Sequence, residues 1–397
     1  MQLEKKHTSF YNNLLKNKEI SFYIHWPFCD MKCPYCDFNS YFVKIIEFQK
    51  WEKAFIKEVN RACNFFKESI IKTLFFGGGT PSLMEVDLIA KIIELVKNHN
   101  SKLNFIDTIE ITLETNPSSF EIDKFKTIKN AGVNRISIGV QSFNEENLKF
   151  LGRNHNQETA KFALNHANNI FENVSFDLIC GLENQPFSFF KKDLEIAKNY
   201  FKNHLSVYHL TIEPTTPFFK KQVKILEENL ACDLFKETIN FLYKENLVQY
   251  EISNFAKINC ESKHNLNYWN GGSYVGVGPL AYGRIIYLNN FYETVQIKNP
   301  NKWLNSVLDD DEKDFYYDNF VFIEFKLIEK KARLEEIIMT KLRLNKFMDL
   351  ELVDLLDKNI LKELEYEKLI IKNNLGEIKL TVEGQLVLNS IIYKILA

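Results

Sequence analysis

Glycine and proline are scarce in this chain, and their positions indicate where unusual backbone geometry is needed. Only 14 of the 397 residues are glycine and nine are proline. Twelve of the glycines fall between Gly77 and Gly283, and none occurs from Arg284 to Leu375. Because glycine adopts backbone conformations that other residues avoid, we expect the chemistry to lie in the first three-quarters of the chain.

Two further absences exclude whole classes of protein. No apolar run approaches the roughly 18 residues that span a bilayer, and residues 1–19 are too charged for a signal peptide. Fifty Lys and Arg against 52 Asp and Glu leave a net charge of −2, without the basic excess of a nucleic-acid-binding protein. The sequence predicts a cytoplasmic protein of two or three globular domains, with no transmembrane segment and no nucleic-acid partner.

Three of the seven cysteines, Cys29, Cys33 and Cys36, lie within eight positions after a predicted strand. In a long chain without a signal peptide, such a group indicates metal or cluster ligation and not a disulfide framework. Three thiolates can hold a [4Fe–4S] cluster by three of its irons and leave the fourth iron open. A zinc site, with His25 four residues upstream as a further ligand, is the alternative.

Short apolar strands alternate with longer helical patterns through the first 212 residues. This alternation is typical of an α/β fold with a parallel sheet. Six strand–helix units are too few for an eight-stranded barrel, so we predict a partial (β/α)6 barrel. The predicted strands are 20–26, 70–76, 108–113, 134–140, 174–179 and 205–212. The predicted helices are 47–66, 85–98, 121–130, 144–169 (as two helices) and 188–201.

Polar or glycine-rich residues lie near the end of every predicted strand or directly after it. They are the cysteine group, Gly77–Pro81, Glu114–Pro117, Gln141–Ser142, Asp177 and Glu213–Pro214. Ligands of parallel α/β folds bind at the carboxyl ends of the strands, so these segments are expected to meet at one mouth. The alternative is that strand exits are loops and therefore polar for no functional reason.

The pattern changes after about residue 228. A helix over 230–244 leads to a strand over 248–253 and a glycine- and aromatic-rich stretch over 264–283. Beyond 320 we predict helices over 333–344 and 350–364, a hairpin over 366–380 and a helix over 382–396 that Thr381 caps. We therefore predict three units, 1–228, 229–320 and 321–397. The last is mostly helical and winged-helix-like, and without a basic stripe it reads as a helical lid.

The spacing C-x3-C-x2-C, with Tyr35 before the last cysteine, resembles the radical S-adenosylmethionine (SAM) signature. Gly77–Pro81 resembles the glycine motif of that superfamily, and it lacks the Gly-Lys-Ser/Thr ending of a phosphate loop. The resemblance implies that the open iron of the cluster binds the methionine moiety of SAM. It also implies an electron donor for the cluster.

A closer resemblance, to the oxygen-independent coproporphyrinogen III oxidase family, covers nearly the whole chain. It rests on Tyr23-Ile-His-Trp-Pro-Phe-Cys29, Glu114-Thr-Asn-Pro117, Arg135-Ile-Ser-Ile-Gly-Val-Gln-Ser-Phe143, Leu151-Gly-Arg-Asn-His155, Asp177-Leu-Ile-Cys-Gly-Leu182 and Leu210-Thr-Ile-Glu-Pro214. It implies SAM contacts by Tyr23, Tyr35, Gly78, Gly79, Thr80, Glu114, Gln141, Arg153 and Asp177. Carboxylates and amides suit ribose hydroxyls and an amino group, and an arginine suits a carboxylate.

Two branches of this family differ near the cysteines and near residue 264. The oxidase branch has a fourth cysteine where this chain has Phe38, whereas His264-Asn-Leu-Asn-Tyr-Trp269 resembles a motif of the heme-chaperone branch. That branch implies a protein that binds heme and passes it to an acceptor apo-hemoprotein. The implied heme contacts are His264, Tyr268 and Trp269.

Alternatives remain at these positions. A histidine beside aromatic residues is by itself more typical of a structural, hydrogen-bonded group than of a ligand. Tyr282 stands where the family has histidine; tyrosinate can ligate ferric heme, or a second ligand is lost. The other function hypotheses are a porphyrinogen decarboxylase of the oxidase type and a zinc-binding module. No catalytic residue is assigned.

Overall fold

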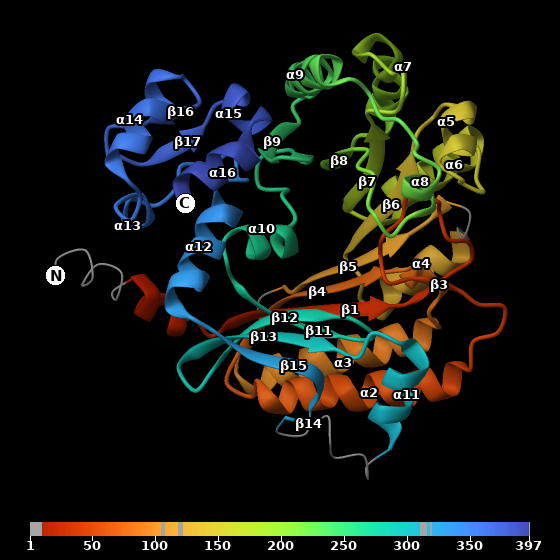
Figure 1. Cartoon of the computed structure of the whole chain (residues 1–397). Coiled ribbons are helices and arrows are strands. Elements are labelled where there is room, and N and C mark those ends of the chain that lie inside the picture. The colour runs from red at the N-terminus through yellow and green to blue at the C-terminus, as the bar shows by residue number, and fades with distance from the viewer. Residues whose placement is uncertain (1–9, 105–107, 118–121, 310–315, 318–319, 397) are drawn as a thin grey trace.

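A curved sheet, mostly parallel at its centre, organises the molecule (Figure 1). The computed structural model describes residues 10–104, 108–117, 122–309, 316–317 and 320–396. Within this part of the chain the sheet has 13 strands in the order β14-β15-β13-β12-β11-β1-β4-β5-β6-β7-β8-β10-β9. Because β14 and β9 are edge strands, the sheet is an open, partial barrel.

Seven neighbouring strands of the sheet are parallel. They are β11 (Ser273–Val277), β1 (Glu19–Trp26), β4 (Ile70–Gly78), β5 (Glu110–Thr115), β6 (Arg135–Gln141), β7 (Asn173–Cys180) and β8 (His204–His209). All six predicted strands are present, although the last ends at His209 and not at residue 212. The seventh, β11, was not predicted. It pairs with β1, although the paired residues are about 250 positions apart in the chain. The alternation of apolar and polar residues does not show which strands pair across such a separation.

Antiparallel strands extend the sheet at both edges. On one side lie β10 (Asn254–Ala256) and β9 (Val248–Glu251); on the other lie β12 (Tyr282–Tyr287), β13 (Asn290–Gln296), β15 (Phe320–Ile328) and β14 (Tyr316–Tyr317). β15 pairs with β13 and so carries the sheet past the predicted boundary at residue 320. The three predicted units stay a prediction. Two short strands, β2 (Phe28–Cys29) and β3 (Tyr41–Phe42), pair beside the main sheet.

Helices cover the convex face of the sheet (Figure 1). The helices up to residue 308 are α2 (Phe48–Phe65), α3 (Val86–Lys102), α4 (Ile122–Ala131), α5 (Glu145–Phe150), α6 (Gln157–Ile170), α7 (Phe187–Ala197), α8 (Pro217–Lys220), α9 (Glu228–Lys244), α10 (Lys263–Trp269) and α11 (Pro300–Leu308), with 3₁₀ turns at Pro81–Leu83 and Lys198–Tyr200. The predicted helices of this range are present as α2 to α7 and α9, and the predicted helix 121–130 begins outside the described residues; α8, α10 and α11 were not predicted. No helix among the described residues is long and apolar enough to cross a membrane.

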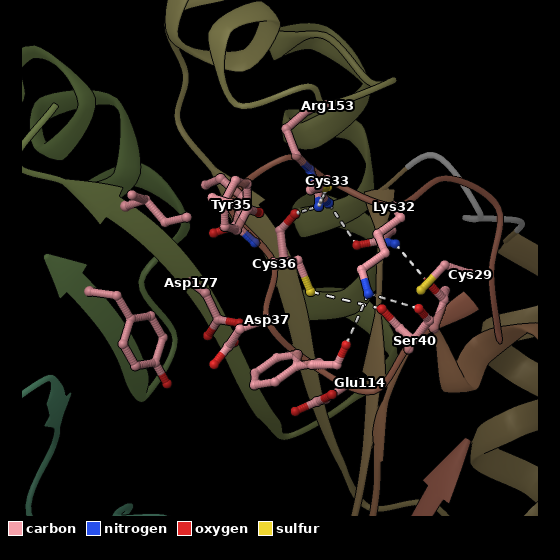
Figure 2. A pocket seen from close by; sticks show the side chains of 18 of the residues that line it. Cys29, Lys32, Cys33, Tyr35, Cys36, Asp37, Ser40, Glu114, Arg153 and Asp177 are labelled. Atoms are coloured by element: carbon pink, nitrogen blue, oxygen red, sulfur yellow. Dashed lines mark hydrogen bonds between the residues drawn. The ribbon is translucent and has the colours of Figure 1, made fainter. Parts of the chain in front are cut away.

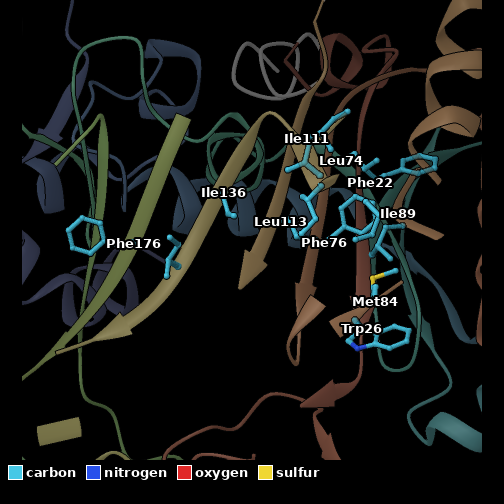
Figure 3. Packing of buried hydrophobic residues seen from close by; sticks show 14 of the residues in the cluster. Phe22, Trp26, Leu74, Phe76, Met84, Ile89, Ile111, Leu113, Ile136 and Phe176 are labelled. Carbon is cyan, nitrogen blue, oxygen red and sulfur yellow. The ribbon is translucent and has the colours of Figure 1, made fainter. Parts of the chain in front are cut away.

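The main hydrophobic core lies between the sheet and these helices (Figure 3). Alternation along each strand sends one set of side chains outward to this core. On β6, Ile136 and Ile138 are fully buried in the core, whereas Ser137 and Gly139 face the concave side. The concave face of the parallel strands is thereby left with polar and small side chains, which are available to a ligand.

Helix α10 lies on the concave side, between the sheet and the C-terminal elements (Figure 1). The Glu110 carboxylate on β5 accepts hydrogen bonds from the backbone N–H groups of Lys263 and His264, at 3.1 and 3.0 Å. A carboxylate at a helix N-terminus satisfies free donors and opposes the helix dipole. Glu110 therefore fixes α10, which carries the predicted heme residues, to the inner wall of the sheet.

The C-terminal elements form a second hydrophobic cluster, built from residues 334–391. They are α12 (Lys330–Lys341), α13 (Leu350–Val353), α14 (Lys358–Tyr366), β16 (Ile370–Lys372), β17 (Ile378–Leu380), α15 (Val382–Leu386) and α16 (Leu388–Leu396). The predicted hairpin is confirmed, as is the cap at Thr381, whose hydroxyl accepts from the Gly384 N–H at 3.0 Å. The predicted helix 350–364 is wrong as one element. It breaks before Asp357, which caps α14.

Candidate functional site

A cavity of about 370 Å³ opens at the carboxyl ends of β4 to β8; we call it the first cavity (Figure 2). Its wall gathers segments from residue 29 to residue 213, as the polar strand exits predicted. All three predicted cluster cysteines and eight of the nine predicted SAM residues line it: Cys29, Cys33, Cys36, Tyr35, Gly78, Gly79, Thr80, Glu114, Gln141, Arg153 and Asp177. The sequence did not single out Asn116, Ser137, Tyr208 or His209, which also line it.

The loop with the three thiols is fixed from two sides. The Arg153 guanidinium donates from Nη1 to Cys33 Sγ at 3.3 Å, and from Nη2 to Asn116 Oδ1 and the Gly139 carbonyl at 2.6 and 2.9 Å. The structure thus gives Arg153 a positioning role as well as a place in the cavity wall. Burial raises the pKa values of the Cys29 and Cys36 thiols, so they are protonated until a metal displaces the protons.

Gly79 brings bare backbone against the cysteine loop. A Cβ at this position would lie 2.4 Å from the Phe28 carbonyl oxygen and 3.0 Å from Cys29 Sγ. The Gly79 N–H donates to Trp26 and the Thr80 N–H donates to Phe28, at 2.7 and 2.8 Å. Only glycine allows this close approach. The three thiols lie in one cavity wall, and Gly79 places backbone without a side chain beside Cys29. This arrangement fits a cluster bound by the thiols with space beside it for a second ligand.

His25 does not complete a zinc site with the cysteines. Its Nε2 is hydrogen-bonded to the Asn39 carbonyl at 3.0 Å, and its Nδ1 to the Tyr23 hydroxyl at 3.2 Å. Within the described part of the chain, no three His, Cys, Asp or Glu side chains converge where a single ion could bind. With both ring nitrogens of His25 in hydrogen bonds, the candidate donors are the thiols of Cys29, Cys33 and Cys36, and three thiolates suit the [4Fe–4S] hypothesis better than a Cys3His zinc site.

Two carboxylates, Glu114 and Asp177, face each other across the cavity. Burial, with a smaller contribution from the Asp177 charge, raises the pKa of Glu114 to about 8. Burial also raises the pKa of Asp177 to about 6, against opposing hydrogen bonds from Ser206 and Ser137. The buried Arg135 guanidinium lowers both pKa values without cancelling these effects. Such a pair is suited to a ligand that supplies hydroxyl or ammonium donors.

Glu114→Gln is expected to flatten the pH dependence of stability. The folded pKa of about 8 exceeds the ordinary 4.5, so stability contributed by protonated Glu114 is complete below pH 4.5 and is lost as the pH rises through 8. After allowance for water in the cavity, we expect the unaltered protein to lose about 1 to 3 kcal/mol more unfolding free energy than the variant between pH 5.5 and 8.5. Urea unfolding at both pH values, beside Glu213→Gln as control, measures this; parallel pH profiles would contradict it.

Tyr23 does not line the first cavity, contrary to its predicted role as a SAM contact. Its ring stacks on Phe75, with centroids 6.1 Å apart, and its hydroxyl binds His25. A Cβ at Gly77 would lie 2.8 Å from this ring. The side chain lies on the concave side of the sheet, where its ring centroid is 6.4 Å from that of His264 on α10. The motif position alone could not reveal this direction.

His264 is a buried, fully hydrogen-bonded histidine. It is 1% exposed, with Nδ1 2.6 Å from the Thr73 hydroxyl and Nε2 2.7 Å from the Tyr268 hydroxyl. Burial lowers the pKa of the imidazole to about 3, which keeps it neutral. In this structure its predicted role as an iron ligand requires one of these two bonds to break. The arrangement shown is the structural alternative that the sequence left open.

Tyr268 and Trp269 line a second cavity of about 620 Å³, between the cysteine loop, α10, β12 and α12. Tyr23 and Tyr282 also line it. Asp37 and Phe38 belong to the walls of both cavities. The predicted SAM residues and two of the predicted heme residues are thus on neighbouring cavities with a shared wall.

The fold has a close counterpart among solved structures. The coproporphyrinogen III oxidase of Escherichia coli, described as a radical SAM enzyme, superposes with a TM-score of 0.78 over 97% of this chain and 92% of its own, at 21% identity. The family model of the Radical SAM superfamily matches residues 23–197, from β1 to the end of α7. The fold and the first cavity together define a protein of the radical SAM class.

Relatives identify the branch within this class. The heme chaperone HemW of Buchnera aphidicola subsp. Schizaphis graminum is 36% identical over 96% of this chain and 99% of its own length. The heme chaperone HemW of Escherichia coli is 35% identical over 83% and 88% of the two chains. The mitochondrial radical S-adenosyl methionine domain-containing protein 1 of Danio rerio is 37% identical over 68% and 61%. The chain belongs to the HemW family.

Proposed function

We propose that this protein is a heme chaperone, which binds heme and transfers it to an acceptor hemoprotein, and that its first cavity holds a [4Fe–4S] cluster and SAM. The observation that carries the proposal is the joint wall of the two cavities. One cavity collects three thiols and the buried carboxylates of Glu114 and Asp177, and the other collects the aromatic residues of α10. The names of the relatives support heme as the cargo.

In the first cavity, different residues would bind the cluster and SAM. Cys29, Cys33 and Cys36 would hold the cluster, which when bound supplies a redox centre with one iron free of protein ligands. Gly79 keeps the wall open beside Cys29. Glu114 and Asp177 would accept hydrogen bonds from the ligand's hydroxyl and amino groups, and those donors would offset their mutual repulsion.

In the second cavity Tyr268 and Trp269 would offer apolar ring faces to a porphyrin. His264 orients Tyr268 through the 2.7 Å hydrogen bond, and the Arg343 guanidinium lies 5.1 Å from the Trp269 ring centre. These contacts hold both side chains before a ligand arrives. Preorganised aromatic side chains lose little conformational entropy on binding.

An anaerobic heme titration of the cluster-reconstituted protein tests the proposed function. We expect a saturable change of the Soret band near one heme per chain, because Tyr268 and Trp269, the two aromatic residues proposed to contact heme, line the same cavity. The same preparation is assayed with coproporphyrinogen III under reducing conditions, where Phe38 in place of a fourth cysteine predicts no protoporphyrinogen. Heme binding that does not saturate, together with porphyrinogen turnover, would replace the chaperone by the decarboxylase.

A further inference from the structure

The second cavity has a lining that suits a flat ligand with carboxylates at its edge. Six Phe, Tyr and Trp side chains lie on its wall: Tyr23, Phe38, Tyr268, Trp269, Tyr274 and Tyr282. Arg284, Arg333 and Glu336 add charged groups to the same wall. Pockets that combine apolar rings with a few fixed polar groups bind and orient small molecules.

The charged groups of this wall are held in place. Arg284 pairs with Glu336 and Glu293 at 2.8 and 3.2 Å, and Arg333 pairs with Glu336 at 2.6 Å and lies over the Phe291 ring. These pairs join β12 and β13 to α12. The cavity therefore has a fixed polar region, contributed by the C-terminal elements, as well as its aromatic region.

Among the tyrosines that line this wall, Tyr282 has the most exposed side chain. It is 47% exposed, and its hydroxyl makes no hydrogen bond to any residue that the structure describes. Its backbone is held by pairing with Val295, and its carbonyl oxygen lies only 2.4 Å from where a Cβ on Gly276 would be. A fixed backbone with a free hydroxyl at a cavity is the arrangement expected of a ligand-binding group.

The ring nitrogens of the two histidines near the second cavity already have hydrogen-bond partners. His264 and His25 each have both ring nitrogens in hydrogen bonds, and they are 1% and 6% exposed. Coordination by either imidazole would break a buried hydrogen bond and leave its partner unsatisfied. Coordination by Tyr282 breaks no such bond.

We propose that the second cavity is the heme site and that the phenolate oxygen of Tyr282 is the axial ligand of ferric heme; this rests on the proposed heme-binding function. The Tyr282 hydroxyl releases its proton to solvent, and an iron–oxygen bond replaces a water on the ferric iron. No electron is transferred. Phenolate is an established ligand of ferric heme in proteins, and Arg284, two residues along β12, lines the same cavity.

Ferric heme titrations of the full-length, cluster-reconstituted protein and of Tyr282→Phe and Tyr282→His test the assignment. Absorption and resonance Raman spectra excited in the phenolate-to-iron charge-transfer band follow the ligand. We expect this band in the unaltered protein. We expect its loss and at least tenfold weaker binding in Tyr282→Phe, and imidazole-type spectra in Tyr282→His. Tyr366→Phe, at an 89% exposed position on α14, is the matched control.

The outcomes separate this inference from the function on which it rests. Saturable heme binding with the same spectrum and affinity in Tyr282→Phe as in the unaltered protein would overturn the ligand assignment alone. The absence of saturable binding in the unaltered protein would overturn both proposals. Far-ultraviolet circular dichroism of each variant verifies that any loss of binding reflects the missing hydroxyl and not unfolding.

Discussion

Alanine at Cys29, Cys33 or Cys36 is expected to abolish the visible absorbance of the reconstituted cluster. Each thiol lies in the wall of the first cavity, and no other cysteine lines it among the described residues. A cluster bound by three thiolates loses a third of its protein ligands with each substitution. The loss is measured by anaerobic reconstitution followed by absorbance and by iron and acid-labile sulfide analysis. We expect each variant to lose more than roughly 80% of the cluster absorbance of the unaltered protein, because no other thiol of the cavity can replace the missing ligand.

Cys63→Ala is the control for this experiment. Cys63 is a buried thiol of α2 that packs in the main hydrophobic core, and burial raises its pKa to about 12. It therefore behaves as a small apolar side chain. Iron content in Cys63→Ala should equal that of the unaltered protein. Equal loss in Cys63→Ala and Cys33→Ala would show that the ligand assignment is wrong, since instability alone would then explain both.

Gly79→Ala is expected to weaken SAM binding at least tenfold. The new methyl group would lie 2.4 Å from the Phe28 carbonyl oxygen, and backbone cannot rotate away as a side chain can. The Thr80 N–H donates to that same oxygen, so this hydrogen bond would have to stretch. Because Phe28 directly precedes Cys29, we expect the Cys29 thiol to shift as well. Isothermal titration of SAM into reconstituted protein, alongside its iron content, measures the effect.

Gly139→Ala is the control for Gly79→Ala, because its added methyl group would contact a side chain that can move and not fixed backbone. A Cβ at Gly139 would lie 2.8 Å from Gln141 Nε2, which is the end of a flexible side chain. We expect a smaller loss of SAM affinity there because that amide can rotate. Equal affinities in the unaltered protein and Gly79→Ala would contradict the idea that bare backbone at this point is required by the ligand.

Local pattern was sufficient to predict the parallel part of the fold. The strands from β1 to β8 are short apolar runs that helices separate, and each run is buried on its outer face. Convergence of the strand exits follows from parallel geometry, and eight of the nine residues that the family resemblance implies as SAM contacts line one cavity. Pairing of β11 with β1 depends on contacts between residues about 250 positions apart. No local period encodes such a contact.

Side-chain direction was the part of the site that the sequence could not supply. Tyr23 and His264 belong to motifs, yet both make hydrogen bonds that the motifs do not predict, Tyr23 with His25 on the same strand and His264 with Thr73 on β4. Asn116 was read as part of a strand exit, but its role in holding Arg153 depends on a 2.6 Å contact across the cavity. The spacing of a motif predicts which residues lie near the carboxyl ends of the strands. Packing against other elements decides which of their side chains face the first cavity.

The wall that Asp37 and Phe38 contribute to both cavities has a thermodynamic consequence. Phe38 is 59% exposed and therefore has room to change rotamer when either side fills. An occupant that displaces this ring alters the space left for the other occupant. Linkage then requires reciprocity: whatever factor the nucleoside ligand applies to porphyrin affinity, the porphyrin applies to the nucleoside ligand. If both proposed ligands bind, their shared contact with Asp37 and Phe38 would couple the binding of one to the binding of the other.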